Sequence, residues 1–131
     1  MYMLDTNICI YIIKKRPISI LERFSEIQEG QLSVSVVTLA ELQYGVERSS
    51  SKKFNQQILN DFISRILVLY WDEGAANHYG KIRVYLEKKG TPIGNMDLMI
   101  ASHALSRRCT LISNNLREFM RVPNLKTENW V

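Results

Sequence analysis

Residues 1–15 read MYMLDTNICIYIIKK, and this stretch decides the fold. Tyr2–Leu4 is a short apolar run typical of a strand, and it ends at the carboxylate of Asp5. The residues from Thr6 to about Lys15 are typical of a helix that stops before Pro17. The opening of the chain is therefore predicted to be a buried strand with a carboxylate at its tip, followed directly by a helix.

The rest of the chain repeats this alternation of short β-rich runs and longer helical runs. Further strands are predicted at Leu32–Val37, Leu67–Tyr70 and Thr110–Ile112, with Leu125–Lys126 as a last candidate. Further helices are predicted over Ser19–Gln28, Thr38–Arg48, Phe54–Ile66, Glu73–Lys88 and Asn95–Arg107, with a short one over Leu116–Met120. Strands that alternate with helices indicate an α/β fold, in which helices cover both faces of a parallel sheet.

The composition is that of an ordinary globular protein with a slight excess of positive charge. The chain has 131 residues, of which 46% are hydrophobic, and this length predicts one domain over residues 1–131. Lys and Arg number 17 against 13 Asp and Glu. No apolar run reaches the ~18 residues of a membrane helix, and the first residues lack a signal-peptide pattern. We expect a cytoplasmic protein whose Cys9 and Cys109 are reduced and buried.

Three carboxylates stand where strands end or helices begin. Asp5 follows the first strand, Glu41 lies in the first turn of the helix after the second strand, and Asp97 begins a later helix. Ligands of open parallel sheets bind beyond the carboxyl ends of the strands, so we expect these acids to gather at one edge. Converging carboxylates repel one another unless a cation lies between them. Hard cations such as Mg²⁺ take oxygen ligands and can activate water to hydrolyse a phosphodiester.

Each carboxylate also has a structural explanation. Glu41 stands three residues after Thr38, which is the spacing of a helix capping box. Asp97 could simply favour a helix N-terminus through the helix dipole. Asp5 is harder to explain in this way, because a charge set against apolar residues is usually paired or bound to a metal. Spacing alone leaves these alternatives open.

Four short motifs resemble, in order, those of the PIN-domain family. They are MLDTN at Met3–Asn7, AEL at Ala40–Leu42, GNMDLMIA at Gly94–Ala101, and LISNNLREF at Leu111–Phe119 followed by RVPNL at Arg121–Leu125. The last stretch is similar to the VapC branch of that family. Each motif is short, but four in order over essentially the whole chain are specific. The resemblance implies a three-layer α/β/α sandwich with a central, mostly parallel sheet.

The resemblance also implies an activity, a cofactor and partners. The implied function is the toxin of a type II toxin–antitoxin system, an endoribonuclease that uses Mg²⁺ or Mn²⁺ and whose substrates include tRNA. The implied partners are a VapB-like antitoxin and a second copy of the chain in a homodimer. The chain would contact operator DNA only through the antitoxin, and no membrane is involved. Two alternatives remain: a catalytically weak PIN-like module that binds RNA or protein, and a PIN nuclease that acts on DNA or in RNA maturation.

Carried over by position, the resemblance makes Asp5, Glu41 and Asp97 the metal-binding acids. The fourth acidic position departs from most of the family, which has an Asp where this chain has Asn115. Relatives with this Asn–Asn pattern use the Glu of the following Arg–Glu–Phe, which is Glu118. The resemblance therefore implies Glu118 as the fourth catalytic acid, while Asn115 could ligate or position water without adding charge.

Neighbouring polar residues are expected to support these acids. Thr6 is either a helix N-cap or a residue of the site, and Asn7 could hold a metal-bound water. Ser113 follows a strand directly and is a further supporting candidate, as is Asn115.

The basic residues fall into clusters, which either form solvated faces or contact the phosphates of RNA. The clusters are Lys14–Arg16, Arg48 with Lys52–Lys53, Lys81 with Arg83 and Lys88–Lys89, and Arg107–Arg108. The two histidines, His78 and His103, lack the paired spacing of a zinc site and are expected in surface or packing roles.

Overall fold

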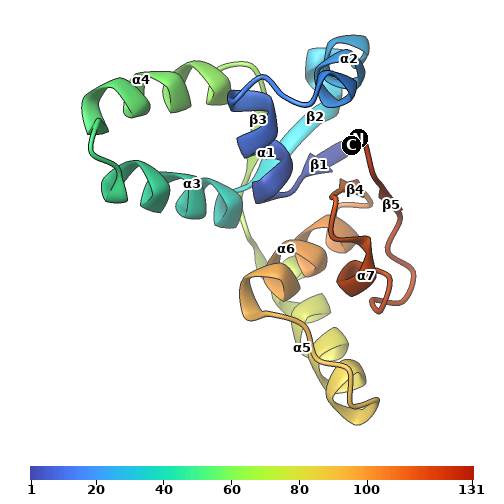
Figure 1. Cartoon of the computed structure of the whole chain (residues 1–131). Coiled ribbons are helices and arrows are strands. Elements are labelled where there is room, and N and C mark those ends of the chain that lie inside the picture. The colour runs from blue at the N-terminus through green and yellow to red at the C-terminus, as the bar shows by residue number, and fades with distance from the viewer.

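The computed structural model describes residues 1–131 and has a five-stranded sheet at its centre (Figure 1). The strands are β1 (Tyr2–Leu4), β2 (Leu32–Ser35), β3 (Leu67–Leu69), β4 (Thr110–Ile112) and β5 (Thr127–Glu128). Their spatial order is β3-β2-β1-β4-β5, and every neighbouring pair is parallel. The strand order reverses direction at β1, and ligands of such sheets bind at this switch point.

Helices cover both faces of the sheet, as predicted. They are α1 (Thr6–Ile13), α2 (Ile18–Glu26), α3 (Val36–Arg48), α4 (Lys52–Ile63), α5 (Glu73–Lys88), α6 (Asn95–Ser106) and α7 (Leu116–Phe119), with a 3-10 turn η1 (Glu29–Gln31) before β2. In Figure 1, α1 to α4 lie on one side of the strands and α5 to α7 on the other. None of these helices is long and apolar enough to cross a bilayer.

Two hydrophobic cores form because successive strand residues point to opposite faces of the sheet. Leu4 and Ile112 belong to a cluster of 14 buried residues on the α1–α4 side. Met3 and Leu111 belong to a cluster of 13 buried residues on the α5–α7 side. The sheet is therefore buried on both faces, which confirms the predicted three-layer α/β/α sandwich.

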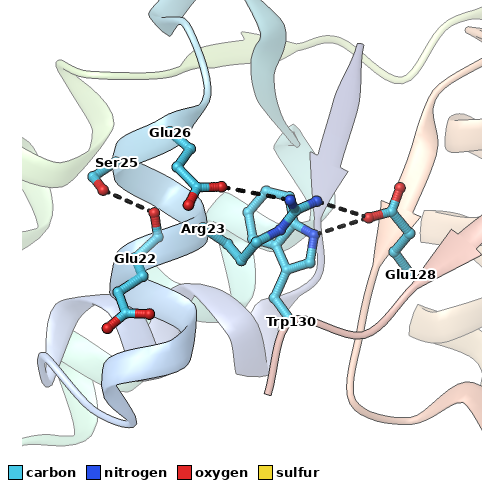
Figure 2. Close-up of polar contacts among 6 residues, drawn as sticks. All are labelled: Glu22, Arg23, Ser25, Glu26, Glu128 and Trp130. Carbon is cyan, nitrogen blue, oxygen red and sulfur yellow. Dashed lines mark hydrogen bonds and ion pairs between the residues drawn. The ribbon is translucent and has the colours of Figure 1, made fainter.

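The C-terminal segment is held against α2 by the side chain of Arg23 (Figure 2). Arg23 Nη2 donates to Glu128 Oε1 at 3.1 Å, and its guanidinium lies 5.4 Å from the ring centre of Trp130. Trp130 Nε1 donates to the same carboxylate at 3.2 Å. These contacts neutralise Glu128 and fix the edge strand β5.

Several predicted boundaries differ from the structure, most of them by one to three residues. The helix predicted from Thr38 begins at Val36, because the Ser35 hydroxyl caps it by accepting from Val37 N at 3.1 Å. The strand predicted at 125–126 forms at 127–128 because Leu111 N of β4 donates to Lys126 O and Ser113 N, just after β4, donates to Glu128 O. The helix predicted over 54–66 spans 52–63. The first shift makes the Thr38–Glu41 capping box wrong, since Thr38 lies inside the helix.

Candidate active site at the carboxyl edge of the sheet

Asp5 lies at the centre of the site, where β1 ends beside β4. Asp5 N donates to Ile112 O at 3.0 Å, and this bond fixes the Asp5 backbone next to the end of β4. Asp5 Oδ1 accepts from Ile8 N at 2.9 Å, so Asp5 itself caps α1 and the predicted N-cap role of Thr6 is wrong. Burial raises the pKa of Asp5 above 3.8, hydrogen bonds from Ser113 and Ile8 N oppose this, and repulsion from Glu41 adds to it.

Glu41 lies in the second turn of α3, one turn deeper than predicted, because the helix begins at Val36. Thr6 Oγ1 donates to Glu41 Oε1 at 2.6 Å and so joins the start of α1 to α3. Thr6 therefore orients one of the predicted acids. Asn7 is exposed and its side chain makes no hydrogen bond within the chain, and its supporting role, to hold a metal-bound water, stays a prediction.

Asp97 lies in the first turn of α6, as predicted, and is half-buried. Its pKa is raised from 3.8 to about 6. The largest cause is burial, followed by a hydrogen bond with Glu118 and by the repulsion between the two carboxylates. Repulsion from Asp5 and Glu41 raises it further. The other three predicted acids, Asp5, Glu41 and Glu118, therefore all lie within electrostatic reach of Asp97 at one edge of the sheet.

The turn after β4 brings Glu118 toward Asp97. Ser113 Oγ accepts from Asn115 N at 2.8 Å, which bends the chain into the short helix α7 that carries Glu118. Asn115 precedes α7, and its side chain makes no capping hydrogen bond. Asn114, between these two residues, donates from Nδ2 to the Tyr11 hydroxyl at 2.9 Å. Of the two candidates for the fourth acidic position, Glu118 is the one that acts on the Asp97 carboxyl.

A buried hydrogen bond connects the two helices that carry Glu41 and Asp97. His103 on α6 is fully buried, and its Nδ1 lies 2.7 Å from Oγ of Ser35, the N-cap of α3. Burial and the nearby Arg107 lower the pKa of His103 below 6.5, which favours the neutral ring, and the tautomer of that ring decides which of the two groups donates. The sequence predicted a packing role for His103, but nothing in it identified Ser35 as the partner.

The four carboxylates fit a hard divalent cation by their chemistry. All their donor atoms are oxygens, and none of the four forms an ion pair with Lys or Arg within the chain. As the side chains stand, no three Asp, Glu, His or Cys residues are close enough to share a metal ion. Glu41 is held by Thr6 and Asp5 by Ile8 N, so these carboxylates would have to turn toward a common point to bind one.

An apolar groove runs up to the site between α1, α3 and α4. Its volume is about 250 Å³, and Glu41 lies in its wall together with Lys14. The apolar part of the wall is formed by Ile10, Ile13, Leu42, Val46, Ile58 and Leu59. The groove therefore joins an aliphatic surface to one of the four carboxylates.

Comparison with known proteins identifies relatives along the whole chain. Residues 2–125 match the PIN domain. The chain is 50% identical over 130 residues to Ribonuclease VapC2 of Haemophilus influenzae, which covers 99% of this chain and 98% of that protein. It is 49% identical over 129 residues to the tRNA(fMet)-specific endonuclease VapC of Shigella flexneri, and the match covers 98% of this chain and 97% of that protein. The crystal structure of VapBC2 from Rickettsia felis, bound to a DNA fragment from their promoter, superimposes with a TM-score of 0.94 at 45% identity, covering 99% of this chain and 98% of that one.

Proposed function

Because the chain belongs to the PIN-domain family, we propose that it is the toxin of a VapBC-type toxin–antitoxin pair, an endoribonuclease that cuts RNA phosphodiester bonds. The observation that carries this proposal is the gathering of Asp5, Glu41, Asp97 and Glu118 at one edge of the sheet, where none of them has a Lys or Arg partner within the chain. A catalytically weak module would have no need of this costly arrangement. We propose that residues 1–131 act as a single nuclease domain.

The family uses divalent metals, and we propose Mg²⁺ at this site, with Mn²⁺ as a substitute. Asp5, Glu41 and Asp97 would hold the ion and Glu118 would complete the acidic set. When bound, a divalent cation activates a water molecule and neutralises charge that develops on the phosphate. The positions of Ser113 and Asn115 support a secondary role in shaping the turn that carries Glu118.

The carboxylates of the site differ in how the chain holds them. The Asp5 backbone is fixed to β4, so Asp5 gives the site a rigid reference point. Thr6 restrains Glu41 from one side and leaves its second carboxylate oxygen free of a hydrogen bond within the chain. Asp97 and Glu118 lie against each other and share the strongest repulsion, so this pair gains most from a cation.

The printed functions of the relatives support tRNA as the substrate class. The Shigella flexneri protein is a tRNA(fMet)-specific endonuclease, and half of its residues are the same as here. We propose that this chain also cuts a structured tRNA. The chain carries 17 Lys and Arg against 13 Asp and Glu, and an excess of positive charge favours binding to polyphosphate chains.

We propose that a VapB-like antitoxin inhibits the site by occupying the apolar groove beside Glu41. An apolar segment of the antitoxin would lie along the six aliphatic residues of the groove. A basic side chain at its end, best an Arg, would reach the carboxylates, because a guanidinium can replace the charge of the metal and bind carboxylates in a bidentate manner. The chain would then contact operator DNA only through the antitoxin, in line with the DNA-bound VapBC2 complex.

We also propose a cytoplasmic homodimer. Both thiols are buried, and burial raises the pKa of Cys9 well above 9.0, which fits a reducing compartment without disulfides. Phe54 on α4 is 63% exposed and Val84 on α5 is 50% exposed, and exposed apolar side chains of this size favour an interface. Light scattering at micromolar concentration measures the mass, and a monomer would contradict the dimer.

The proposed function is tested by inducing the chain without its antitoxin and mapping new RNA 5′ ends. Purified protein should cut the same RNA at the same positions in Mg²⁺ and should stop in EDTA. Asp5→Asn, which keeps the shape of the side chain and removes its charge, serves as the matched inactive control. Cleavage that persists in EDTA, or in the Asp5→Asn protein, would overturn the metal-dependent mechanism.

A further inference from the structure

We propose that a basic hollow on the side of the molecule away from the four carboxylates binds the phosphate backbone of the substrate RNA. The basic hollow is formed by Lys81, Tyr85, Arg108 and Asn124, with a volume of about 500 Å³, and by an adjoining recess of about 210 Å³ that adds Lys126. The proposal rests on the ribonuclease function proposed above and names a second contact for the same substrate.

The charge of the hollow is positive and uncompensated. Lys81, Arg108 and Lys126 lie in its wall, and no carboxylate lies in the wall of either part. The four ion pairs within the chain use only Arg23, Arg65 and Arg83 as their basic partners, so the three cations of the hollow have no acidic partner. Cations left unpaired around a concave surface attract an anionic ligand.

An aromatic side chain at the hollow adds a feature that suits RNA in particular. Tyr85 is 39% exposed, and the ammonium group of Lys89 lies 5.3 Å from the centre of its ring. Bases of unpaired nucleotides stack on exposed aromatic rings of this kind, and a nearby cation strengthens the contact. A ligand that contacts the cations through its phosphates and stacks one base on Tyr85 must have an unpaired base. A single-stranded or loop segment of RNA fits this requirement.

The basic hollow is too far from the carboxylates to be part of the cutting site. Arg108 stands just before β4, whereas Ser113 follows it at the carboxyl edge. Arg108 itself lies in a turn, and at about 3.3 Å per residue the four steps from 109 to 113 correspond to about 13 Å. A short oligonucleotide bound at the cutting site would not reach the hollow, whereas a folded RNA of tRNA size would. The hollow therefore selects for large substrates.

A second copy of the chain is a poor occupant for this hollow. A two-fold dimer axis would place Lys81 and Arg108 against the same cations of the other copy, and like charges would repel across the interface. DNA has the same phosphate groups as RNA, so the experiment must distinguish a hollow that binds RNA from one that binds DNA.

The experiment measures cleavage of two substrates by the full-length protein in Mg²⁺. The substrates are a tRNA(fMet) transcript and a short oligonucleotide that carries only the cut sequence. For the double variant Lys81→Glu/Arg108→Glu we expect KM for the tRNA to rise about tenfold or more, with kcat and cleavage of the oligonucleotide unchanged. Lys52→Glu/Lys53→Glu, the same charge change on α4 outside the hollow, is the matched control and should alter KM much less.

A binding measurement separates this proposal from the proposed function. The measurement is the affinity for tRNA in EDTA at several salt concentrations. A plot of the logarithm of affinity against the logarithm of salt concentration should have a shallower slope for the double variant than for the wild type. The slope should change by about 0.7 to 0.9 for each phosphate contact that is lost. If the protein binds tRNA but cuts nothing, the ribonuclease function fails while the hollow still stands. Equal effects in both double variants, unchanged KM, or a loss of affinity for duplex DNA alone would overturn the hollow as an RNA site. If the Lys81→Glu/Arg108→Glu protein has a lower melting temperature than the wild type, Lys81→Gln/Arg108→Gln is used in its place.

Discussion

Replacing Asp97 by Asn should make the metal-free protein more stable while it abolishes activity. Asn keeps the shape of the side chain and removes a charge that burial disfavours most and that Glu118, Asp5 and Glu41 also repel. A first-turn acid that served only the helix dipole would instead stabilise α6, and its loss would cost a few tenths of a kcal/mol. The two explanations of Asp97 therefore differ in the sign of the stability change.

The magnitude follows from the raised pKa of Asp97. A shift from 3.8 to about 6 corresponds to about 3 kcal/mol if the full difference acts on folding. Asp97 is only half-buried, so solvent screens part of the repulsion and we expect about 1–2 kcal/mol. For a chain of this length that is about 4–7 °C in Tm.

The pH dependence has a definite sign. Because the folded protein holds the Asp97 proton more tightly than the unfolded chain, the wild type loses stability as the pH rises from about 4 to above 6. The advantage of Asp97→Asn should be full at pH 7.5 and vanish below about pH 4, where the Asp97 carboxyl is protonated in both folded and unfolded chains.

The assay is thermal melting in EDTA across this pH range, with RNA cleavage in Mg²⁺ measured on the same preparations. Glu73→Gln is the matched control, because Glu73 is also a first-turn acid but belongs to α5. It should melt within a few tenths of a kcal/mol of wild type and cut normally. An Asp97→Asn protein that melts at or below the wild-type temperature at pH 7.5 would refute the repulsion argument, and one that cuts RNA at the wild-type rate would remove Asp97 from the site.

Three further changes test other parts of the site. Glu118→Gln should reduce cleavage by about 100-fold or more and raise the metal-free Tm, whereas Asn115→Ala should stay within a few-fold of wild type; similar effects from both would reopen the fourth acidic position. Thr6→Val, which removes the hydrogen bond to Glu41, should lower affinity for Mn²⁺ in calorimetry by about 10-fold with a Tm change of only a few degrees, and unchanged affinity would dismiss the orienting role. His103→Gln should lose less stability than wild type between pH 7 and 5, because burial lowers the pKa of His103 and its protonation on acidification disfavours the fold; parallel melting profiles would contradict this.

The sequence predicted most of the fold because the strands and helices have strong local signals. β1 and β4 have the predicted bounds, and α5 spans the predicted 73–88 because Asp72 caps it and the basic residues lie at its end. The start of α3 was wrong because Ser35 and Thr38 are both good capping residues, and local sequence cannot choose between them. In the structure Ser35 is the cap, and its hydroxyl also lies in hydrogen-bond contact with His103, 68 residues away.

The gathering of the acids at one edge of the sheet was predicted from the sequence, but their contacts were not. Parallel strands bring their carboxyl ends to one edge, so the positions of Asp5 and Asp97 followed from the predicted sheet. The hydrogen bond from Thr6 to Glu41 joins residues 35 positions apart and depends on how α1 packs against α3. The approach of Glu118 to Asp97 depends in the same way on the turn after β4. Contacts of this kind have no periodic pattern in the sequence.

The hydrogen bond between Ser35 and His103 restricts how the chain can diverge. Aliphatic contacts between α3 and α6 tolerate the exchange of one side chain for another of similar volume. Loss of Ser35 would leave Nδ1 of the buried His103 without a hydrogen bond, at a cost of about 1–3 kcal/mol, and would also remove the cap of α3. Replacing both by apolar residues would avoid the unpaired ring nitrogen but would still lose the cap, at a cost of about 0.5–2 kcal/mol. Lineages of this protein should therefore keep Ser35 wherever they keep His103, and the surface of each helix should vary independently of this pair.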